Sequence, residues 1–375
     1  MARQALGRKK GITILDVAAR SGVSYQTVSR VINKMPDVAP ETRLRVQQVM
    51  AELGYRPNMT ARQLVSQRSI VIGFVTWATS MYGPAQIMIN VERAAREAGY
   101  SLMFAGVTEA SVETIRRSVA KLCAHQVAGI VMHVPFELDL HAVRQVSANV
   151  PLVAADCDLG FEAPSVLVQQ ERGAWMATQH LISLGHTKIA YLRGTRVWRV
   201  SRLRYEGWLR AMEEAGYPPG PCVEGDWSAR SGFEAGLGLI EHHRGQFTAL
   251  AVANDQMALG AIQAFERRGL RVPKDVSVIG FDDLAEAEFF SPPLSTVHHD
   301  LASIGTLSVR CLIDQLNGMP SARSLYTIEP TLVPRRSTSA PGRRQRALKA
   351  ATPHRAREES GGPSGIMRGE VLAQP

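Results

Sequence analysis

Hydrophobic positions follow two different rhythms along the chain. Near the N-terminus, apolar residues recur at helical spacing in three short stretches that turn-forming residues separate. This pattern predicts helices over roughly residues 14–20, 25–32 and 40–53, with Thr13 and Ser24 as the N-caps of the first two. A small helical head therefore precedes the rest of the chain.

From residue 69 the rhythm changes to continuous apolar, β-branched runs that alternate with amphipathic helical stretches. Such runs are typical of parallel strands that helices cover on both faces. Some ten strands are too many for one compact sheet, so we predict an α/β body of two similar, doubly wound lobes. The expected strands are SIVIGFVT, SLMFAGV, VAGIVMHV, PLVAAD, SVLVQ, KIAYLRG, ALAVAND and VSVIGFDD, and the expected helices include 85–98, 171–184, 203–215 and 255–268.

Charge separates the parts further. Residues 1–68 carry 12 Lys and Arg against 4 Asp and Glu, and residues 335–375 carry 9 against 3. Since the whole chain has a net charge of +9, the segment between them is mildly acidic. A small basic head on an acidic body indicates that the head contacts a polyanion. The C-terminal excess is better explained as a solvated tail, because from Pro341 the chain is rich in Arg, Ala, Ser, Gly and Pro, which predicts disorder.

Membrane and secreted proteins are disfavoured by the composition. No run of about 18 apolar residues is present, so we expect no membrane span. No apolar segment follows the basic N-terminus, so we expect no signal peptide. The four cysteines are scattered without a CxxC pair, which favours free thiols in a reduced cytoplasm.

Catalysis and metal binding are disfavoured as well. The sequence has neither a GxxxxGK[ST] loop nor a GxSxG elbow. The pairs His242-His243 and His298-His299 are adjacent, so their side chains tend to point apart, and Asp282-Asp283 has no evident third ligand. We therefore expect no enzyme, no metal and no cofactor.

The second helix of the head carries candidate DNA-reading chemistry. About four residues that include Gly22 separate it from the first helix, which fits a helix-turn-helix. Gln can hydrogen-bond base edges and Arg can bind guanine through two hydrogen bonds, whereas Ser and Thr hydroxyls hold phosphates. An ordinary exposed helical hairpin is the alternative, and the local positive charge disfavours it. The predicted DNA contacts of the head are Tyr25, Gln26, Ser29, Arg30, Ser24, Thr27 and Asn33.

The segment TILDVAARSGVSYQTVSRVIN, followed by TRLRVQQVMAELGYRPN, resembles the head of the LacI/GalR family of bacterial transcription regulators. The resemblance continues through ARQLV, EGDWSARSGF, VANDQMALGA and VIGFDD and covers about residues 12–336. It implies that Tyr25, Gln26 and Arg30 read operator bases. It also implies a body like the type I periplasmic sugar-binding proteins, which fits the two lobes expected from the strand pattern.

The resemblance assigns a hinge helix to residues 58–66 and a minor-groove wedge to Leu64. An apolar side chain that enters a base step kinks the duplex and lets more protein surface make contact. The weak helix propensity of NMTARQLV suits a segment that folds only on DNA and can be switched. From the residues alone, the preferred interpretation of Leu64 is a linker residue that packs on the body.

Polar residues at strand ends are candidates for holding a sugar. Asp156, Asn254 and Asp282 each follow an apolar run, and ligands of open α/β sheets bind beyond the carboxyl ends of the strands. Arg204 begins a helix, and Trp227 offers a flat apolar face. Carboxylate, guanidinium and amide groups suit sugar hydroxyls, which both donate and accept hydrogen bonds. The resemblance aligns all five with inducer-contacting positions, and it aligns an apolar wall with Met81, Gly83, Pro84 and Ile87.

The chain departs from the family pattern around this site. Trp77 stands where a small residue is expected, Val168 and Leu301 where aromatic residues are expected, and Val200 where serine is expected. These changes leave the hydroxyl-binding groups intact and alter the surroundings of an aglycone or second ring. A β-galactoside is the predicted inducer. Another β-linked disaccharide, a corepressor, and a sugar-binding protein without a DNA role are the alternatives.

A second departure concerns assembly. Tetrameric members of the family end in a leucine heptad helix, whereas here Pro353, Gly361, Gly362 and Pro363 would interrupt one. We therefore predict a homodimer, with Leu259 and Phe290 as interface or core residues. The predicted parts are a head (1–57), a hinge (58–68), a body (69–336) and a tail (337–375), with a first lobe at about 69–168 and 300–327 and a second at about 169–299 and 328–336.

Overall fold

The computed structural model describes residues 12–56, 69–77, 80–109, 111–136, 140–147, 150–157, 163–319 and 324–342. The chain forms two compact units, one up to Val71 and one from Ile72 onward. We call the first the head and the second the body, and each is described by itself. The predicted hinge, Leu64 and the tail from residue 343 lie outside the described residues.

The head consists of three helices, α1 (Ile14–Ser21), α2 (Tyr25–Ile32) and α3 (Pro40–Glu52), as the sequence predicts. The Thr13 hydroxyl caps α1 in a reciprocal box with Asp16, and Ser24 caps α2 by accepting a hydrogen bond from the Thr27 amide. Gly22 ends α1 with a left-handed φ of 67°, which makes the tight turn. Apolar side chains of all three helices form one small core.

The first lobe of the body is built on a six-stranded sheet in the order β11-β5-β4-β3-β1-β2. Strands β1 and β3 pair in parallel with Ile72 opposite Gly129, and the β3–β4, β4–β5 and β5–β11 pairs are parallel too. Helices α5 and α12 pack on each other, and α12 covers the middle of the sheet. Its elements are β1 (Val71–Trp77), α5 (Tyr82–Glu97), β2 (Ser101–Val107), α6 (Val112–Ala124), β3 (Gly129–His133), α7 (Leu140–Ser147), β4 (Leu152–Ala155), β5 (Ser165–Val168), α12 (Leu301–Leu316) and β11 (Leu325–Ile328).

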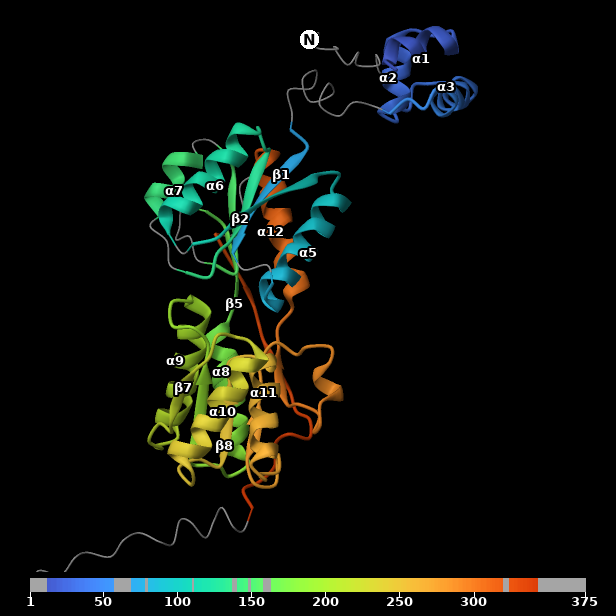
Figure 1. Ribbon diagram of the computed structural model, residues 1–375. Helices are drawn as coiled ribbons and strands as arrows, with labels where there is room; N and C mark the ends of the chain where they lie inside the picture. Colours follow the sequence, from blue (N-terminus) through green and yellow to red (C-terminus); the bar gives the residue numbers. More distant parts are fainter. Residues whose placement is uncertain are drawn as a thin grey trace, which may run out of the picture. The chain divides into compact units, whose positions relative to one another are not determined.

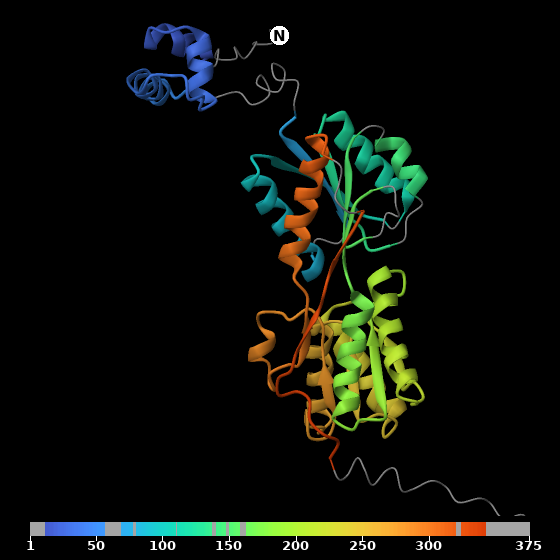
Figure 2. The same ribbon diagram turned by 180° about the vertical axis from the view of Figure 1, so that it is seen from behind.

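The second lobe has a four-stranded parallel sheet in the order β7-β6-β8-β9. The helix pairs α8–α9 and α10–α11 pack closely and cover it. Figure 1 and, from behind, Figure 2 show the two lobes of the body joined end to end by extended segments. The elements are α8 (Gln170–Ser183), β6 (Ile189–Arg193), α9 (Arg199–Glu214), β7 (Cys222–Glu224), α10 (Ala229–His243), β8 (Ala249–Val252), α11 (Asp255–Arg267), β9 (Ser277–Ile279) and the short 3-10 helix η2 (Ala287–Phe289).

The chain crosses between the lobes three times. It crosses from β5 into α8, from β10 (Thr296–His298) into α12, and from β11 into β12 (Thr331–Val333). The two crossing strands β10 and β12 pair antiparallel, with Val297 opposite Leu332. The prediction of a helix-turn-helix head and of two parallel α/β lobes is confirmed, and this antiparallel ribbon is an addition that the apolar runs did not indicate.

The boundary predicted between body and tail at residue 337 is wrong. Ser337 is fully buried and its hydroxyl donates to the carbonyl of Val278, 2.6 Å away. Ser339 accepts a hydrogen bond from the buried ring of His186 at 2.9 Å. Residues 337–339 are therefore fastened to the second lobe, because their polar groups complete hydrogen bonds of its edge.

Within the described residues the cysteines are free thiols and no helix is suited to span a membrane. All four cysteines lie within them, and none forms a disulfide there. Burial raises the pKa of Cys157 to about 12, so this thiol stays protonated and donates to the Met132 carbonyl at 3.2 Å. Among the helices that the structure describes, none combines the length and the apolar character that a bilayer crossing requires.

Candidate functional site

The predicted DNA-reading residues lie on the exposed side of α2 in the head. Tyr25 is 53% exposed, and Gln26 and Arg30 are exposed as well, whereas Val28 and Val31 of the same helix are buried. Arg30 lies 3.5 Å from the Asp37 carboxylate in a solvent-exposed pair, which is weak and readily exchanged. The helix therefore presents a polar, cationic face that a partner can reach.

The predicted phosphate contacts have structural roles in the free head. Ser24 and Thr27 hydroxyls lie 3.0 Å apart at the start of α2. Asn33 ends the helix, and its amide donates to the Ser29 hydroxyl at 3.4 Å. These side chains frame both ends of the face that carries Tyr25.

A cavity of about 300 Å³ in the body is lined by residues of both lobes. Its size lies at the small end of the range for small-molecule sites. All eight residues that we predicted as ligand contacts line it: Asp156, Arg204, Trp227, Asn254, Asp282, Met81, Pro84 and Ile87. Residues that lie more than 200 positions apart in the sequence are thus brought to one pocket.

The sheet architecture places the polar residues. Asp156 directly follows β4, Asn254 follows β8 and begins α11 as its N-cap, and Asp282 follows β9. Three predicted ligand residues have left-handed backbone angles, with φ of 50° at Asp156, 76° at Trp227 and 105° at Asp282. Such conformations are costly for residues other than glycine, and they gather at functional sites.

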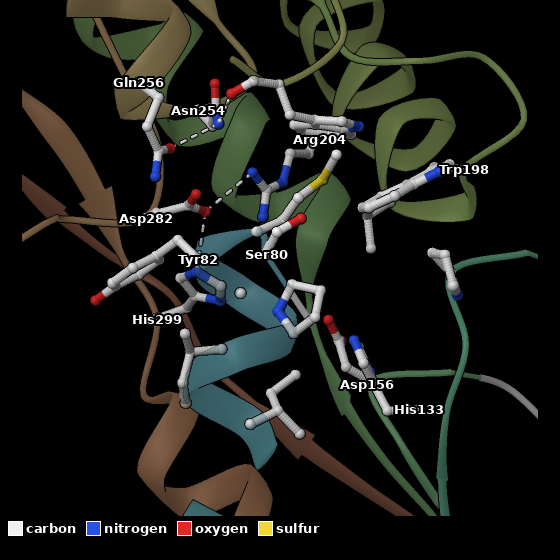
Figure 3. A pocket seen from close by; sticks show the side chains of 18 of the residues that line it. Ser80, Tyr82, His133, Asp156, Trp198, Arg204, Asn254, Gln256, Asp282 and His299 are labelled. Carbon is white, nitrogen blue, oxygen red and sulfur yellow. Dashed lines mark hydrogen bonds and ion pairs between the residues drawn. The ribbon is translucent and has the colours of Figure 1, made fainter. Parts of the chain in front are cut away.

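A buried charged cluster forms one end of the pocket. Arg204 Nη1 donates to Asp282 Oδ1 at 3.1 Å, and both side chains are more than nine-tenths buried. His299 Nε2 also donates to this oxygen at 3.1 Å, since an ionised carboxylate only accepts. The guanidinium carbon of Arg204 lies 3.6 Å from the centre of the Phe281 ring. Figure 3 shows Arg204 and His299 converging on Asp282.

The second carboxylate, Asp156, is held separately. Its Oδ1 accepts the Val168 amide at 3.1 Å and its Oδ2 accepts the side-chain amide of Gln170 at 3.0 Å. Gln170 in turn accepts a hydrogen bond from Arg204 Nε at 2.8 Å. Asp156 and Asp282 are thereby joined through one glutamine and one arginine.

Two tryptophans line the pocket beside these groups. The Trp198 and Trp227 ring centres are 5.3 Å apart with planes inclined by 36°. A Cβ atom at Gly194 would come within 2.2 Å of the Trp227 ring, so this ring requires glycine there. The indole nitrogen of Trp227 is buried and has no hydrogen-bond partner among the described residues. The pair offers the flat apolar surface that sugar C–H groups favour.

The fully buried carboxyl of Asp255 holds the segment that carries Asp282. Asp255 accepts hydrogen bonds from the Thr296 hydroxyl at 2.6 Å and the Leu284 amide at 2.9 Å. Burial, followed by the charge of Asp282, raises the pKa of Asp255 well above its usual value. Asp255 therefore fixes the loop that carries Asp282, at the cost of placing a second acidic group next to it.

His133 is a pocket residue that the sequence reasoning missed. It ends β3 and is 5% exposed, and its Nδ1 donates to the Ala155 carbonyl at 2.7 Å. Burial lowers the pKa of His133, so the ring is neutral near pH 7 and its Nε2 is an acceptor. The rule used for Asp156, a polar residue at the carboxyl end of a strand, would have found it.

Other lining residues carried no such signal. His299 lies after a short crossing strand, and Trp198 lies in a loop before α9. Of the departures from the family pattern, Val200 and Leu301 line the pocket, as does Gly83 of the predicted apolar wall. Trp77 packs edge-on against Phe136 with ring centres 5.3 Å apart, and the Val168 amide supports Asp156.

Two remaining predictions concern other chemistry. Leu259 is half-buried, and so is Phe290, which packs on the core of the second lobe; its neighbour Phe289 is 79% exposed.

The adjacent acids Asp282 and Asp283 point apart, because Asp283 pairs with Arg335 at 2.7 Å and not with the Asp282 cluster. Within the described part of the chain, no three metal-ligating side chains gather.

Comparison with protein families gives two matches along the chain. Residues 13–58 match the family described as bacterial regulatory proteins, lacI family. Residues 178–338 match the periplasmic binding protein-like domain. The first match covers the helix-turn-helix of the head, and the second covers most of the second lobe, the two later crossings, and α12 and β11 of the first lobe.

Several repressors resemble the chain over nearly its whole length. The lactose operon repressor of Escherichia coli (strain K12) is 37% identical over 333 residues, which cover 88% of this chain and 92% of that protein. The repressor PurR of Pasteurella multocida is 35% identical, with 88% of this chain and 99% of the relative covered. The ribose operon repressor of Escherichia coli (strain K12) is also 35% identical, with 87% and 99% covered.

Solved structures agree with these relatives. A lac repressor dimer bound to operator and the anti-inducer ONPF superposes with a TM-score of 0.81 at 37% identity, covering 88% of this chain and all of that one. A complex of the regulator CelR with cellobiose gives 0.66 at 29% identity, covering 87% and 99%. The match extends over both the head and the body.

Proposed function

The chain belongs to the lacI family of bacterial regulatory proteins and is a DNA-binding repressor regulated by a sugar or another small molecule, and from this premise we propose that it binds a pseudo-palindromic operator as a dimer and is released by a β-galactoside. A two-fold dimer presents two copies of α2, which suits two half-sites in successive major grooves.

One observation carries the ligand proposal. The four polar residues expected to hold sugar hydroxyls line one pocket with Trp227 and with an apolar wall from α5. Asp282 Oδ2 and one lone pair on each Asp156 oxygen have no partner among the described residues. They can accept hydrogen bonds from neighbouring hydroxyls, while Arg204 donates. Such alternation of donors and acceptors suits a hexose, and the tryptophan pair suits its apolar face.

Release from DNA would follow from the pocket's position between the lobes. A sugar can shift the arrangement of the lobes only by binding one arrangement more tightly than another. A ligand that touches Met81 and Pro84 in the first lobe and Asn254 in the second depends on how the lobes sit. We propose that this differential affinity withdraws the hinge, with Leu64, from the operator.

A ligand that acts as a corepressor, one of the alternatives named from the sequence, is the second candidate. The PurR relatives are as similar to the chain as the ribose operon repressor is. The sign of the ligand effect separates the two: an inducer weakens operator binding and a corepressor strengthens it.

Fluorescence anisotropy of a labelled palindrome resembling the lac operator, with and without methyl β-D-galactopyranoside at fixed salt, tests the proposal. Salt is fixed because phosphate contacts make affinity salt-dependent. We expect tight binding that the galactoside weakens. Binding that ignores the galactoside but responds to lactose or cellobiose would leave the repressor and replace the inducer. Equal affinity for scrambled DNA would refute operator reading.

The same assay tests α2. Gln26→Ala is expected to lose about 1–3 kcal/mol of preference for the palindrome over scrambled DNA, because a lost base contact affects only specific binding. Gln48→Ala on α3 is the matched control, since Gln48 is exposed and its amide donates to Glu52 at 3.1 Å. An unchanged preference in Gln26→Ala would remove α2 from base recognition.

A further inference from the structure

Gln170 stands between the two halves of the pocket without lining it. It is the first residue of α8, where the chain enters the second lobe from β5, and it is 1% exposed. Its side chain makes two hydrogen bonds, from Nε2 to Asp156 Oδ2 at 3.0 Å and to Oε1 from Arg204 Nε at 2.8 Å. Asp156 belongs to the first lobe and Arg204 to the second, so the amide bridges the lobes.

The chemistry of the two partners restricts what can stand at this position. An arginine side chain only donates hydrogen bonds, and an ionised carboxylate only accepts them. A residue between them must therefore offer one donor and one acceptor, which an amide does. The amide orientation follows from the same argument, because a flipped group would place donor against donor and acceptor against acceptor.

The bridge also keeps two opposite charges apart. If Asp156 and Arg204 paired directly, each would use its strongest hydrogen-bonding groups on the other. With glutamine between them, Asp156 has one protein partner on each oxygen, and Arg204 commits Nη1 to Asp282 and the Ala253 carbonyl. Nη2 of Arg204 has no hydrogen-bond partner among the described residues.

We propose that Gln170 is a positioning residue that holds Asp156 of the first lobe and Arg204 of the second in the arrangement that binds the ligand. Gln170 acts through these two side chains and does not touch the ligand. The identity of the ligand as a sugar rests on the proposed function, whereas the bridge itself rests on the contacts alone.

Gln170→Glu tests the bridge by exchanging one donor for an acceptor at constant shape. Protonated, the introduced carboxyl donates to Asp156 and accepts from Arg204 as the amide does. When it is ionised, it repels the Asp156 carboxylate and cannot donate a hydrogen bond to it. Burial and the charge of Asp156 favour the protonated carboxyl, whereas the charge of Arg204 favours the ionised carboxylate. Raising the pH therefore converts the donor that faces Asp156 into an acceptor. His133, Asp282 and His299 also lie nearby, and they are common to all variants compared.

Sugar affinity is measured by isothermal titration between pH 5 and pH 8, with methyl β-D-galactopyranoside, lactose and cellobiose as probes. We expect Gln170→Glu to bind within about twofold of wild type at pH 5 and about tenfold or more weaker at pH 8, as for a lost charged hydrogen bond. Gln170→Leu is expected to be weak at every pH. Gln263→Glu, an exposed position on α11, serves as the control and should follow wild type.

A second readout needs no ligand. The melting temperature of Gln170→Glu should match that of wild type at pH 5 and fall below it as the pH rises, whereas the deficit of Gln170→Leu should not depend on pH. Melting behaviour as expected with no probe bound by the wild type would reject the sugar class and keep the bridge. Wild-type affinity and melting in Gln170→Glu at pH 8 would overturn the bridge. Lower melting with unchanged sugar affinity would reduce Gln170 to a structural role.

Discussion

The two walls of the pocket differ in how they are built. The second lobe contributes Arg204, Asn254 and Asp282, which are 4%, 4% and 8% exposed and already hydrogen-bonded to protein groups. The first lobe adds two hydrogen-bonded residues, Asp156 and His133, to this polar wall, whereas its α5 side consists of Met81 and Pro84, which offer shape and apolar area but no hydrogen-bonding side chain. The polar wall is therefore held by protein hydrogen bonds before any ligand arrives, and the α5 wall is an apolar surface.

This difference indicates a division of labour. Preorganised polar groups decide which hydroxyl pattern is accepted, because a ligand that lacks a partner leaves a buried group unpaired. An apolar wall discriminates weakly, since one methylene is worth only about 1–3 kcal/mol. Changes in the polar wall should therefore abolish recognition, whereas changes toward the apolar side should retune it.

The largest effect is expected from Arg204→Met. The substitution leaves the Asp282 carboxylate buried with His299 as its remaining side-chain partner, and breaking a buried pair costs about 3–5 kcal/mol of unfolding free energy. Galactoside affinity should fall by about 100-fold or more, because a charged contact and the bridge through Gln170 are both lost. Urea denaturation and calorimetric titration below the melting temperature measure the two effects.

Arg210→Met on the same helix is the matched control. Arg210 is 42% exposed and pairs with Glu171 at the surface, so its loss should cost less than about 1 kcal/mol and leave sugar affinity unchanged. Equal losses in both variants would mean that the charge of α9, rather than the buried pair, supports the pocket.

Asp255→Asn should reveal how the polar wall is supported. The pKa of Asp255 is raised in the folded protein, so its protonated form favours folding at low pH and this contribution is lost as the pH rises from about 4 through the folded value. Asparagine stays neutral throughout. The unfolding free energy of Asp255→Asn relative to wild type should therefore increase with pH across 4.5–8, on top of a constant loss from imperfect hydrogen bonding.

Asp226→Asn provides the contrasting control. Hydrogen bonds from the Ser228 hydroxyl and amide lower the pKa of Asp226, so this group stabilises the fold above its unfolded value of 3.8 and loses that contribution only at lower pH. Its difference from wild type should stay flat between pH 4.5 and 8. Parallel curves for both variants would contradict a raised pKa at Asp255.

The head could be predicted almost completely because its determinants are local. The caps Thr13 and Ser24, the turn at Gly22 and the exposed position of Gln26 each depend on neighbours within four residues. The wedge role of Leu64 stays a prediction, since it depends on a segment outside the described residues.

From the residues alone, pocket positions were predictable where a polar residue follows an apolar strand, whereas the apolar wall was assigned through the family resemblance. Asp156 and Asp282 follow long apolar runs, and His133 follows one equally well. Gln170 begins a helix at one crossing, and His299 follows a short strand at another. Their importance arises from the partners Arg204 and Asp282, which lie 34 and 17 positions away in the sequence. Neither composition nor periodicity carries that information, because the crossings bring together segments whose order in the sequence is unrelated to their contact.

The smallest expected effect, and the finest test of the two walls, is Val200→Ser. Val200 lines the pocket one helical turn before Arg204, where the polar wall meets the apolar one. A hydroxyl here should lower the unfolding free energy by about 1 kcal/mol, because buried apolar area is lost. It should also add one hydrogen bond to a second sugar ring. The affinity ratio of lactose to methyl β-D-galactopyranoside should rise about fivefold, a change typical of one neutral hydrogen bond. Val197→Ser, at a 64% exposed position of the preceding loop, should leave the ratio unchanged. Equal changes for both sugars in Val200→Ser would place Val200 beside the galactose ring, and the boundary between the walls would then lie nearer to α5.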